Sequence, residues 1–241
     1  MELVEIAIVV HVFLLVYWLG GDLGTFYSSR YVIQPGLSVE ARSTALKIMS
    51  FCDVFPRICL VLFLPSGISL LALGPYSGGR LATWMLVPVW ILGLVWLWMV
   101  VTEYRSHGAA SPRLLWIRRL DLWIRYAVIA GTVGFGAALL VGGNAVASGL
   151  SGLDITSNPR WLGLKIAMYG TAILCGVMIR RDLRPFGPSW VALVSGGVST
   201  PEIEAGIGGA IHRSERWVYV IWVCVIGAAV LGIVKPGANG Y

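Results

Sequence analysis

The sequence carries little charge. Only 12% of its 241 residues are Asp, Glu, Lys or Arg, whereas soluble domains carry about 25%. Apolar residues make up 57%, and the mean hydropathy is +0.80. These proportions exclude a water-soluble globular domain, a disordered chain and a soluble Rossmann or TIM-barrel enzyme. They indicate a polytopic membrane protein.

Cysteines are also few, and common catalytic signatures are missing. The four cysteines are scattered without a CxxC or metal-ligand spacing, so we expect small apolar residues and not a disulfide framework. The sequence has no Walker loop, no GxSxG and no HExxH motif, and no GxGxxG fingerprint follows a strand.

Long apolar runs are abundant instead. Each of six runs is close to the 17 to 25 residues that cross a bilayer, and each must be helical because lipid offers its backbone no hydrogen bonds. The sequence therefore predicts an all-α, six-span bundle that forms a single transmembrane domain over residues 1–241. The predicted spans are 3–21, 58–74, 81–101, 126–143, 161–179 and 217–234.

The basic residues gather in three connections between spans. Residues 22–57, 102–125 and 180–216 contain 14 of the 18 lysines and arginines. The positive-inside rule places these connections in the cytoplasm and both termini outside, which predicts a multi-pass inner-membrane protein. This asymmetry accounts for the net charge of +6, so we expect the lipid bilayer, and no nucleic acid, as the partner of the basic residues.

Two of these connections contain helix-start signals. Ser38 is a good N-cap, and Thr200 is another, with Pro201 at the first helical position. Glu202 and Glu204 suit the positive end of the helix dipole in the first turn. We therefore expect two amphipathic helices that extend spans two and six into the cytoplasm.

Two titratable residues lie inside predicted spans. A charged group there costs roughly 2.5–3.5 kcal/mol on insertion scales and usually faces the protein interior. His11 in span one and Lys165 in span five are expected at similar depth in the outer half of the membrane. A neutral imidazole can ligate haem iron or another metal, and a buried lysine can pair with a propionate or act in catalysis. Met168 shares a helix face with Lys165 and can serve as a soft axial ligand.

Each of these residues also has a structural interpretation. His11 can hydrogen-bond a neighbouring helix, Lys165 can extend toward the outer surface, and Met168 can simply pack.

A second set of charges lies at the expected inner edge. Asp22 follows two glycines that we expect to close span one, and Asp53 and Arg57 have the i,i+4 spacing of an ion pair. Asp22 can reach Arg57 or Arg30 if the helix ends meet. We interpret this set as a charged staple that fixes the inner helix ends, and a role in proton or substrate handling is the alternative.

Two motifs carry a resemblance to a known group. HVFLLVYWLGGD at residues 11–22 resembles the first-helix signature His…Trp-x-Gly-Gly of a loose group of small membrane proteins. That group includes the HemJ-type protoporphyrinogen oxidases, the CopD copper-resistance domain and the membrane part of bacterial urate oxidase. Trp161-Leu-Gly-Leu-Lys165 is similar to the Trp-Leu-x-x-Lys motif of a later helix in the HemJ type. The resemblance implies a bound b-type haem, with His11 as its ligand and Lys165 as a catalytic or propionate-binding group.

Three functions follow from these observations. The leading hypothesis is a haem-b-binding membrane oxidoreductase that uses His11 and Lys165. The second is a cofactor-free transporter of a small solute or ion, in which Glu5 joins these two residues; the similar order of helices in the two halves of the chain motivates it. The third is a structural or assembly subunit, in a homo-oligomer or in a larger membrane complex.

Overall fold

The computed structural model describes residues 2–74, 83–106, 111–151, 159–196 and 199–236. Side chains at positions 83, 144 and 147–151 are outside this description. Throughout these ranges the regular structure is helical, which confirms the predicted fold class. The elements are α1 (Leu3–Val32), α2 (Val39–Leu73), the 3₁₀ turn η2 (Thr83–Met85), α3 (Leu86–Arg105), α4 (Pro112–Ser151), α5 (Arg160–Asp182), α6 (Phe186–Gly196) and α7 (Pro201–Val234).

Six of these helices are long and apolar enough to cross a membrane, as predicted. α6 is the exception, with 11 residues. The start of predicted span three, residues 81–82, lies outside the described residues, and α3 itself begins at Leu86. α4 continues past predicted residue 143 through a kink at Gly143, whose φ of 53° suits a glycine.

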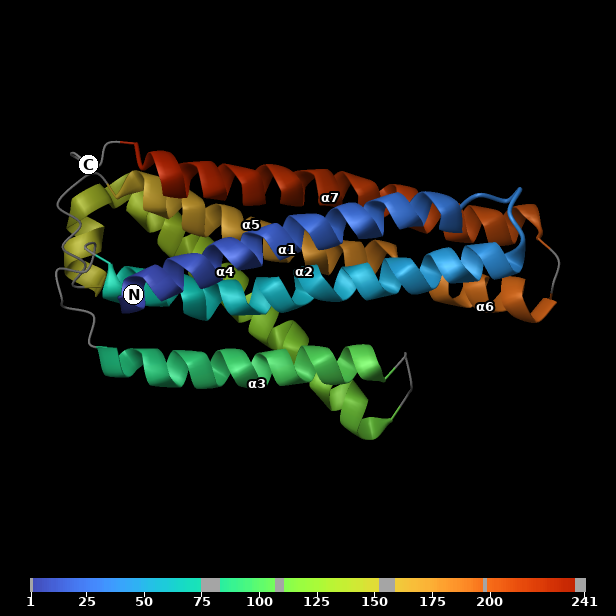
Figure 1. The fold of residues 1–241 in the computed structure, drawn as a ribbon, viewed down its shortest axis with the longest axis horizontal. Helices are drawn as coiled ribbons and strands as arrows, with labels where there is room; N and C mark the ends of the chain where they lie inside the picture. The colour runs from blue at the N-terminus through green and yellow to red at the C-terminus, as the bar shows by residue number, and fades with distance from the viewer. Residues whose placement is uncertain (1, 75–82, 107–110, 152–158, 197–198, 237–241) are drawn as a thin grey trace.

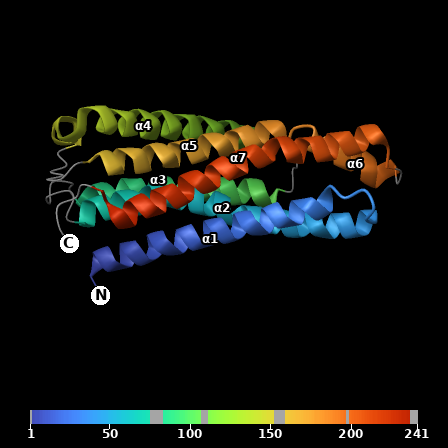
Figure 2. The same cartoon turned by 90° about the horizontal axis from the view of Figure 1, so that it is seen from above.

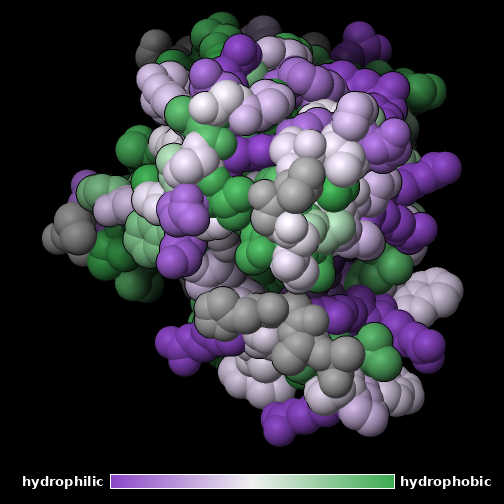
Figure 3. Space-filling model, turned by 90° about the vertical axis from the view of Figure 1, so that its right-hand side faces the viewer, coloured by the Kyte–Doolittle hydropathy of each residue, from purple (hydrophilic) through white to green (hydrophobic). Residues whose placement is uncertain are grey.

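The long helices run side by side, with both chain termini at one end of the bundle (Figure 1). α1 packs along α2, and α5 lies between α4 and α7 (Figure 2). α3 lies at the edge of the bundle against α2, and α4 crosses it at an angle (Figure 1). We call the end with both termini the terminal end. The opposite end holds the α1–α2 and α6–α7 connections, and we call it the basic end; hydrophilic side chains are prominent on it (Figure 3).

Helix α1 continues through Asp22 to Val32, beyond the Gly20-Gly21 pair that was expected to close span one. The position at which the span leaves the apolar layer stays a prediction. Gly21 serves helix packing. A Cβ atom at Gly21 would lie 2.6 Å from Pro56 Cδ and 2.9 Å from the Cys52 carbonyl oxygen. The glycine therefore lets α1 approach α2 closely without interrupting the helix.

The two predicted helical extensions are confirmed. Ser38 Oγ accepts a hydrogen bond from Ala41 N, and Thr200 Oγ1 accepts one from Ile203 N. From these caps α2 and α7 run unbroken for 35 and 34 residues. At 1.5 Å per residue, each is far longer than a hydrocarbon core of about 30 Å, so both extend beyond the apolar layer at the basic end.

These extensions have a hydrophobic core of their own, which the sequence analysis did not anticipate. α6 packs on α7, and together they meet the last turn of α1 and the first turns of α2. We call this cluster the basic-end core; its fully buried members are Val32, Leu193, Ile207 and Ile211.

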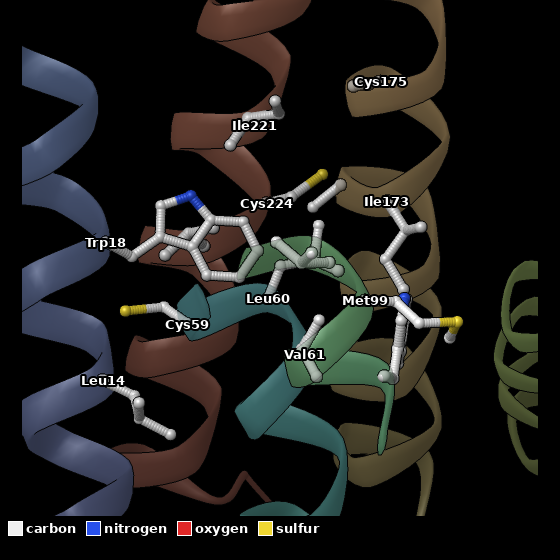
Figure 4. Packing of buried hydrophobic residues seen from close by; sticks show 14 of the residues in the cluster. Leu14, Trp18, Cys59, Leu60, Val61, Met99, Ile173, Cys175, Ile221 and Cys224 are labelled. Atoms are coloured by element: carbon white, nitrogen blue, oxygen red, sulfur yellow. The ribbon is translucent and has the colours of Figure 1, made fainter. Parts of the chain in front are cut away.

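The central core of the bundle takes residues from all six long helices, α1 to α5 and α7; Figure 4 shows part of it. Leu14 and Trp18 contribute from α1, and Ile173 contributes from α5. Cys59, Cys175 and Cys224 are buried there as free thiols, which confirms their expected role as small apolar residues.

Candidate functional site

His11 is held by α2. Its Nδ1 lies 2.9 Å from Ser66 Oγ, and its ring meets Phe63 edge-on, with centroids 4.6 Å apart. Ser66 is 1% exposed. The predicted hydrogen bond between His11 and a neighbouring helix is therefore present, and it fixes the imidazole within the bundle.

The surroundings of Ser66 bear on the protons of this imidazole. Ser66 Oγ also lies 3.3 Å from the Phe63 carbonyl oxygen, to which it can donate. The direction of the bond between Ser66 Oγ and His11 Nδ1 depends on the tautomer of the ring. When Ser66 donates to Phe63, it accepts from Nδ1, and Nε2 keeps its lone pair. Metal-binding histidines have this arrangement, in which the distal nitrogen is anchored and the other is free to coordinate.

Lys165 approaches from α5 and lies against α7. A Cβ atom at Gly232 would be 2.5 Å from Lys165 Nζ, so the glycine provides the room in which the ammonium lies. The charge of Lys165 acts on the His11 imidazole. Both residues lie in the half of the bundle nearest the termini, although they are far apart in the chain. The helices that carry them, α1 and α5, are not among the main packed helix pairs.

Met168 lies one turn further along α5. Its sulfur is 3.2 Å from the Cβ position of Gly227 on α7, and its side chain packs on the central core. The packing interpretation of Met168 fits these contacts, and its role as an axial ligand stays a prediction.

Among the described residues, no three His, Cys, Asp or Glu side chains are grouped as a metal site. In the described part of the chain, His11 therefore does not belong to a metal site made only of His, Cys, Asp or Glu side chains. A b-type haem needs fewer protein ligands, because the porphyrin supplies four nitrogen ligands to the iron and the chain supplies only the remaining ones.

The charged residues that were predicted to form a staple at the inner edge are Asp22, Asp53 and Arg57. The structure pairs only two of them. Asp53 and Arg57 form the expected i,i+4 ion pair. Asp22 instead accepts a hydrogen bond of 3.0 Å from Trp18 Nε1, one turn earlier in α1. Arg30, the other expected partner of Asp22, lies over the Phe26 ring at 4.9 Å.

A buried ionic network lies at the same depth in the bundle as the Asp53–Arg57 pair. It was not predicted from the sequence. Asp121 is 0% exposed and Arg125 is 2% exposed. The Asp121 carboxylate accepts three hydrogen bonds, from Trp96 Nε1 at 2.8 Å, Arg125 Nε at 2.9 Å and Arg180 Nη1 at 2.9 Å. These bonds join α3, α4 and α5 at the basic-end boundary of the apolar spans.

Glu103 widens this network. Its carboxylate lies 3.7 Å from Arg118 Nε and 3.6 Å from Arg180 Nη2. We call the set of seven charged residues on α2 to α5 the boundary network: Asp53, Arg57, Glu103, Arg118, Asp121, Arg125 and Arg180. The i,i+4 spacing of Asp121 and Arg125 within the apolar segment LDLWIRYAV is the signal that could have indicated it.

A second buried ion pair holds the basic-end core. Arg42 is 1% exposed; it donates from Nη1 and Nη2 to the two Glu204 oxygens at 2.7 and 2.9 Å, and from Nε to the Val32 carbonyl at 2.8 Å. Glu204 lies in the extension of α7, outside the apolar span. The hydrogen bonds from Arg42 hold the pKa of its carboxyl below the ordinary value.

Comparisons with protein-family models, curated proteins and solved structures find no match to this chain. The resemblance to the HemJ and CopD group therefore stays a prediction that rests on the two motifs around His11 and Lys165.

Proposed function

We propose that this protein is a membrane-embedded redox protein that binds a b-type haem in the half of the bundle nearest the termini. His11 would be the axial ligand, and Lys165 would bind a propionate. The observation that carries the proposal is the contact of His11 Nδ1 with the buried Ser66, so that Nε2 would be the nitrogen that binds iron.

The donor chemistry of the residues fits such a group. Ser66 sets the tautomer and the ring plane of His11, as outer-shell partners of ligating histidines do. Phe63 covers the ring edge-on, which restricts its rotation. Lys165 lies in the same half of the bundle, seated against Gly232, and its ammonium suits a propionate carboxylate.

Each residue would have a defined task. His11 would hold the iron through Nε2, and Ser66 would keep the proton on Nδ1. Lys165, seated against Gly232, would orient the porphyrin and stabilise a carboxylate within an apolar surrounding. When bound, the haem would supply one-electron redox chemistry.

We also propose that the basic end faces the cytoplasm, so that His11 and Lys165 lie toward the outer surface of an inner membrane. The distribution of arginine and lysine supports this orientation. Reagents that label introduced cysteines only from outside would then modify a cysteine placed at position 2 and not one placed at position 199.

The test is the haem content of the purified protein after expression with a haem supply. We expect a Soret band in the wild type and its loss in His11→Ala. His212→Ala is the matched control, because His212 has a 62% exposed side chain on α7 at the basic end. We expect this control variant to retain the band.

Two results would overturn the proposal. One is a wild-type protein that folds and lacks a Soret band. The other is a His11→Ala variant whose band is as intense as that of His212→Ala.

A further inference from the structure

Arg125 has an unused hydrogen-bond donor inside the protein. Its side chain is 3% exposed, and its Nε is bound to Asp121. Its Nη2 is buried and has no hydrogen-bond partner among the residues that the structure describes. An unpaired donor on a buried charged group is costly, so this N–H is expected to meet an acceptor that the chain itself does not provide.

The surroundings of Arg125 are short of acceptors. Asp121 already accepts three hydrogen bonds, Glu103 faces Arg118 and Arg180, and Asp53 is paired with Arg57. The boundary network contains four arginines against three carboxylates. It therefore has one positive charge in excess.

Three of these guanidinium groups lie close together. Arg125 Nε and Arg180 Nη1 both donate to Asp121 Oδ2 at 2.9 Å, so these two groups lie side by side. The charge of Arg57 also acts on Arg180. Electrostatic repulsion between neighbouring positive charges raises the free energy of the folded protein. An anion bound between them lowers this repulsion. Guanidinium groups present paired N–H donors that match the oxygens of phosphate and carboxylate groups.

The network reaches the surface through two of its arginines. The Arg57 and Arg180 side chains are 35% and 29% exposed, whereas Arg125 is buried. In sequence, Arg125 directly precedes the apolar run 126–143, and Arg180 directly follows the run 161–179. The exposed part of the network therefore lies at the border of the apolar layer, which is the depth of phospholipid phosphates.

We propose that the boundary network is a binding site for a phosphate group. Arg57 and Arg180 bind the phosphate group at the partly exposed rim. Arg125, whose Nη2 is buried and unpaired in this structure, shifts toward the same group and donates to it from the base of the site. A phospholipid headgroup and a free phosphate present this chemistry equally, and the two sources are separated by experiment. The site is independent of haem and of His11.

The experiment uses the full-length protein, delipidated in a neutral detergent. Three probes are titrated separately: inorganic phosphate, dioctanoyl phosphatidylglycerol and, as the phosphate-free control, dioctanoylglycerol. Tryptophan fluorescence reports binding, because Trp96 lies beneath Arg125, with its ring centroid 5.7 Å from the guanidinium carbon.

We expect at least one phosphate probe to bind and dioctanoylglycerol to have no effect. Arg57→Gln and Arg125→Gln are expected to weaken binding about tenfold or more, which corresponds to the loss of one charged hydrogen bond. Arg216→Gln is the matched control, since Arg216 is 64% exposed and pairs with Asp182; it should bind like the wild type. If Arg125→Gln does not fold, Arg57→Gln alone decides.

The outcomes separate the sources. Binding of phosphatidylglycerol without inorganic phosphate identifies a lipid site, and binding of both probes identifies a site for free anions as well. The proposal is overturned if neither phosphate probe binds, if dioctanoylglycerol binds equally, or if Arg57→Gln has no more effect than Arg216→Gln. A haem-free protein that still binds the phosphate probe would leave this proposal intact while the proposed redox function fails.

Discussion

The two halves of the bundle differ in how their charged side chains are paired. At the terminal end, His11 is held by a neutral serine, and Lys165 is seated against Gly232. At the basic end, carboxylates and guanidinium groups neutralise one another in connected networks. Charges that are paired within the chain stabilise helix packing. The less fully paired groups of the terminal end remain available to bind something else.

The same contrast exists within the basic half. The donors of Arg42 are matched to both Glu204 oxygens and to a backbone carbonyl, so this pair is complete. Arg125 has the same degree of burial, but one of its donors is unused. We therefore assign a structural role to Arg42 and a binding role to Arg125.

The largest expected effect is the loss of stability in Asp121→Asn. The amide keeps the shape of the side chain and leaves Arg125 and Arg180 close together without a carboxylate between them. We expect a decrease of about 4 kcal/mol in the free energy of unfolding, measured by denaturant unfolding in detergent micelles. Asp53→Asn, whose partner Arg57 is partly exposed, is the control and should cost less than about 1 kcal/mol. Equal costs would contradict the account.

A slightly smaller loss is expected for Glu204→Gln, which leaves the buried Arg42 without its anion. We expect the free energy of unfolding to decrease by about 3 kcal/mol. The fluorescence of Trp190 reports this unfolding, because its ring lies 5.8 Å from the Arg42 guanidinium carbon. Because the pKa of Glu204 is lowered in the folded state, its stabilisation is present at neutral pH. It is lost as the pH falls through this lowered pKa. A wild-type basic-end core that keeps its full stability in acid would argue against this role.

An intermediate effect is expected where α1 and α2 pack most closely. Gly21→Ala places a methyl group 2.6 Å from Pro56 Cδ and should cost about 2 kcal/mol through overpacking. Gly20→Ala is the matched control, since a Cβ there meets nothing within 4 Å, and it should be neutral or mildly stabilising. If thermal unfolding does not separate the two variants, the proposed contact is wrong.

The smallest expected change in stability belongs to Ser66→Ala. It removes one hydrogen bond to His11, which is worth about 1 kcal/mol. The effect on haem affinity should be larger, about tenfold, because the imidazole loses its orienting partner. Ser43→Ala, on the extension of α2, provides a control for serine replacement. Haem binding that is identical in both variants would show that Ser66 does not prepare His11.

The spans and caps could be predicted because their signals are local. Apolar runs define the six membrane helices, and Ser38 and Thr200 define the starts of α2 and α7 within a few residues. The continuation of α1 past Asp22 could not be predicted, because a glycine pair is compatible with the end of a helix and with close helix packing. Only the position of Pro56 on α2 distinguishes these alternatives.

The charge networks could not be predicted in the same way. His11 and Lys165 were indicated because a titratable residue inside an apolar run is unusual. Asp121 and Arg125 were assigned to a basic connection, since they directly precede a predicted span. Their burial depends on Trp96 and Arg180, which come from helices whose order in the bundle cannot be read from the chain. α6 was missed because its 11 residues are too few for a span. It packs on the neighbouring α7, but the residues of α1 and α2 that complete its core are distant in sequence.

The most direct test of the haem proposal is chemical rescue of the ligand. We expect His11→Gly, expressed with a haem supply, to lack the Soret band of the wild type and to regain it when free imidazole is added, because imidazole can replace the missing side chain beside Ser66. A His11→Gly protein with an undiminished band in the absence of imidazole would contradict the account.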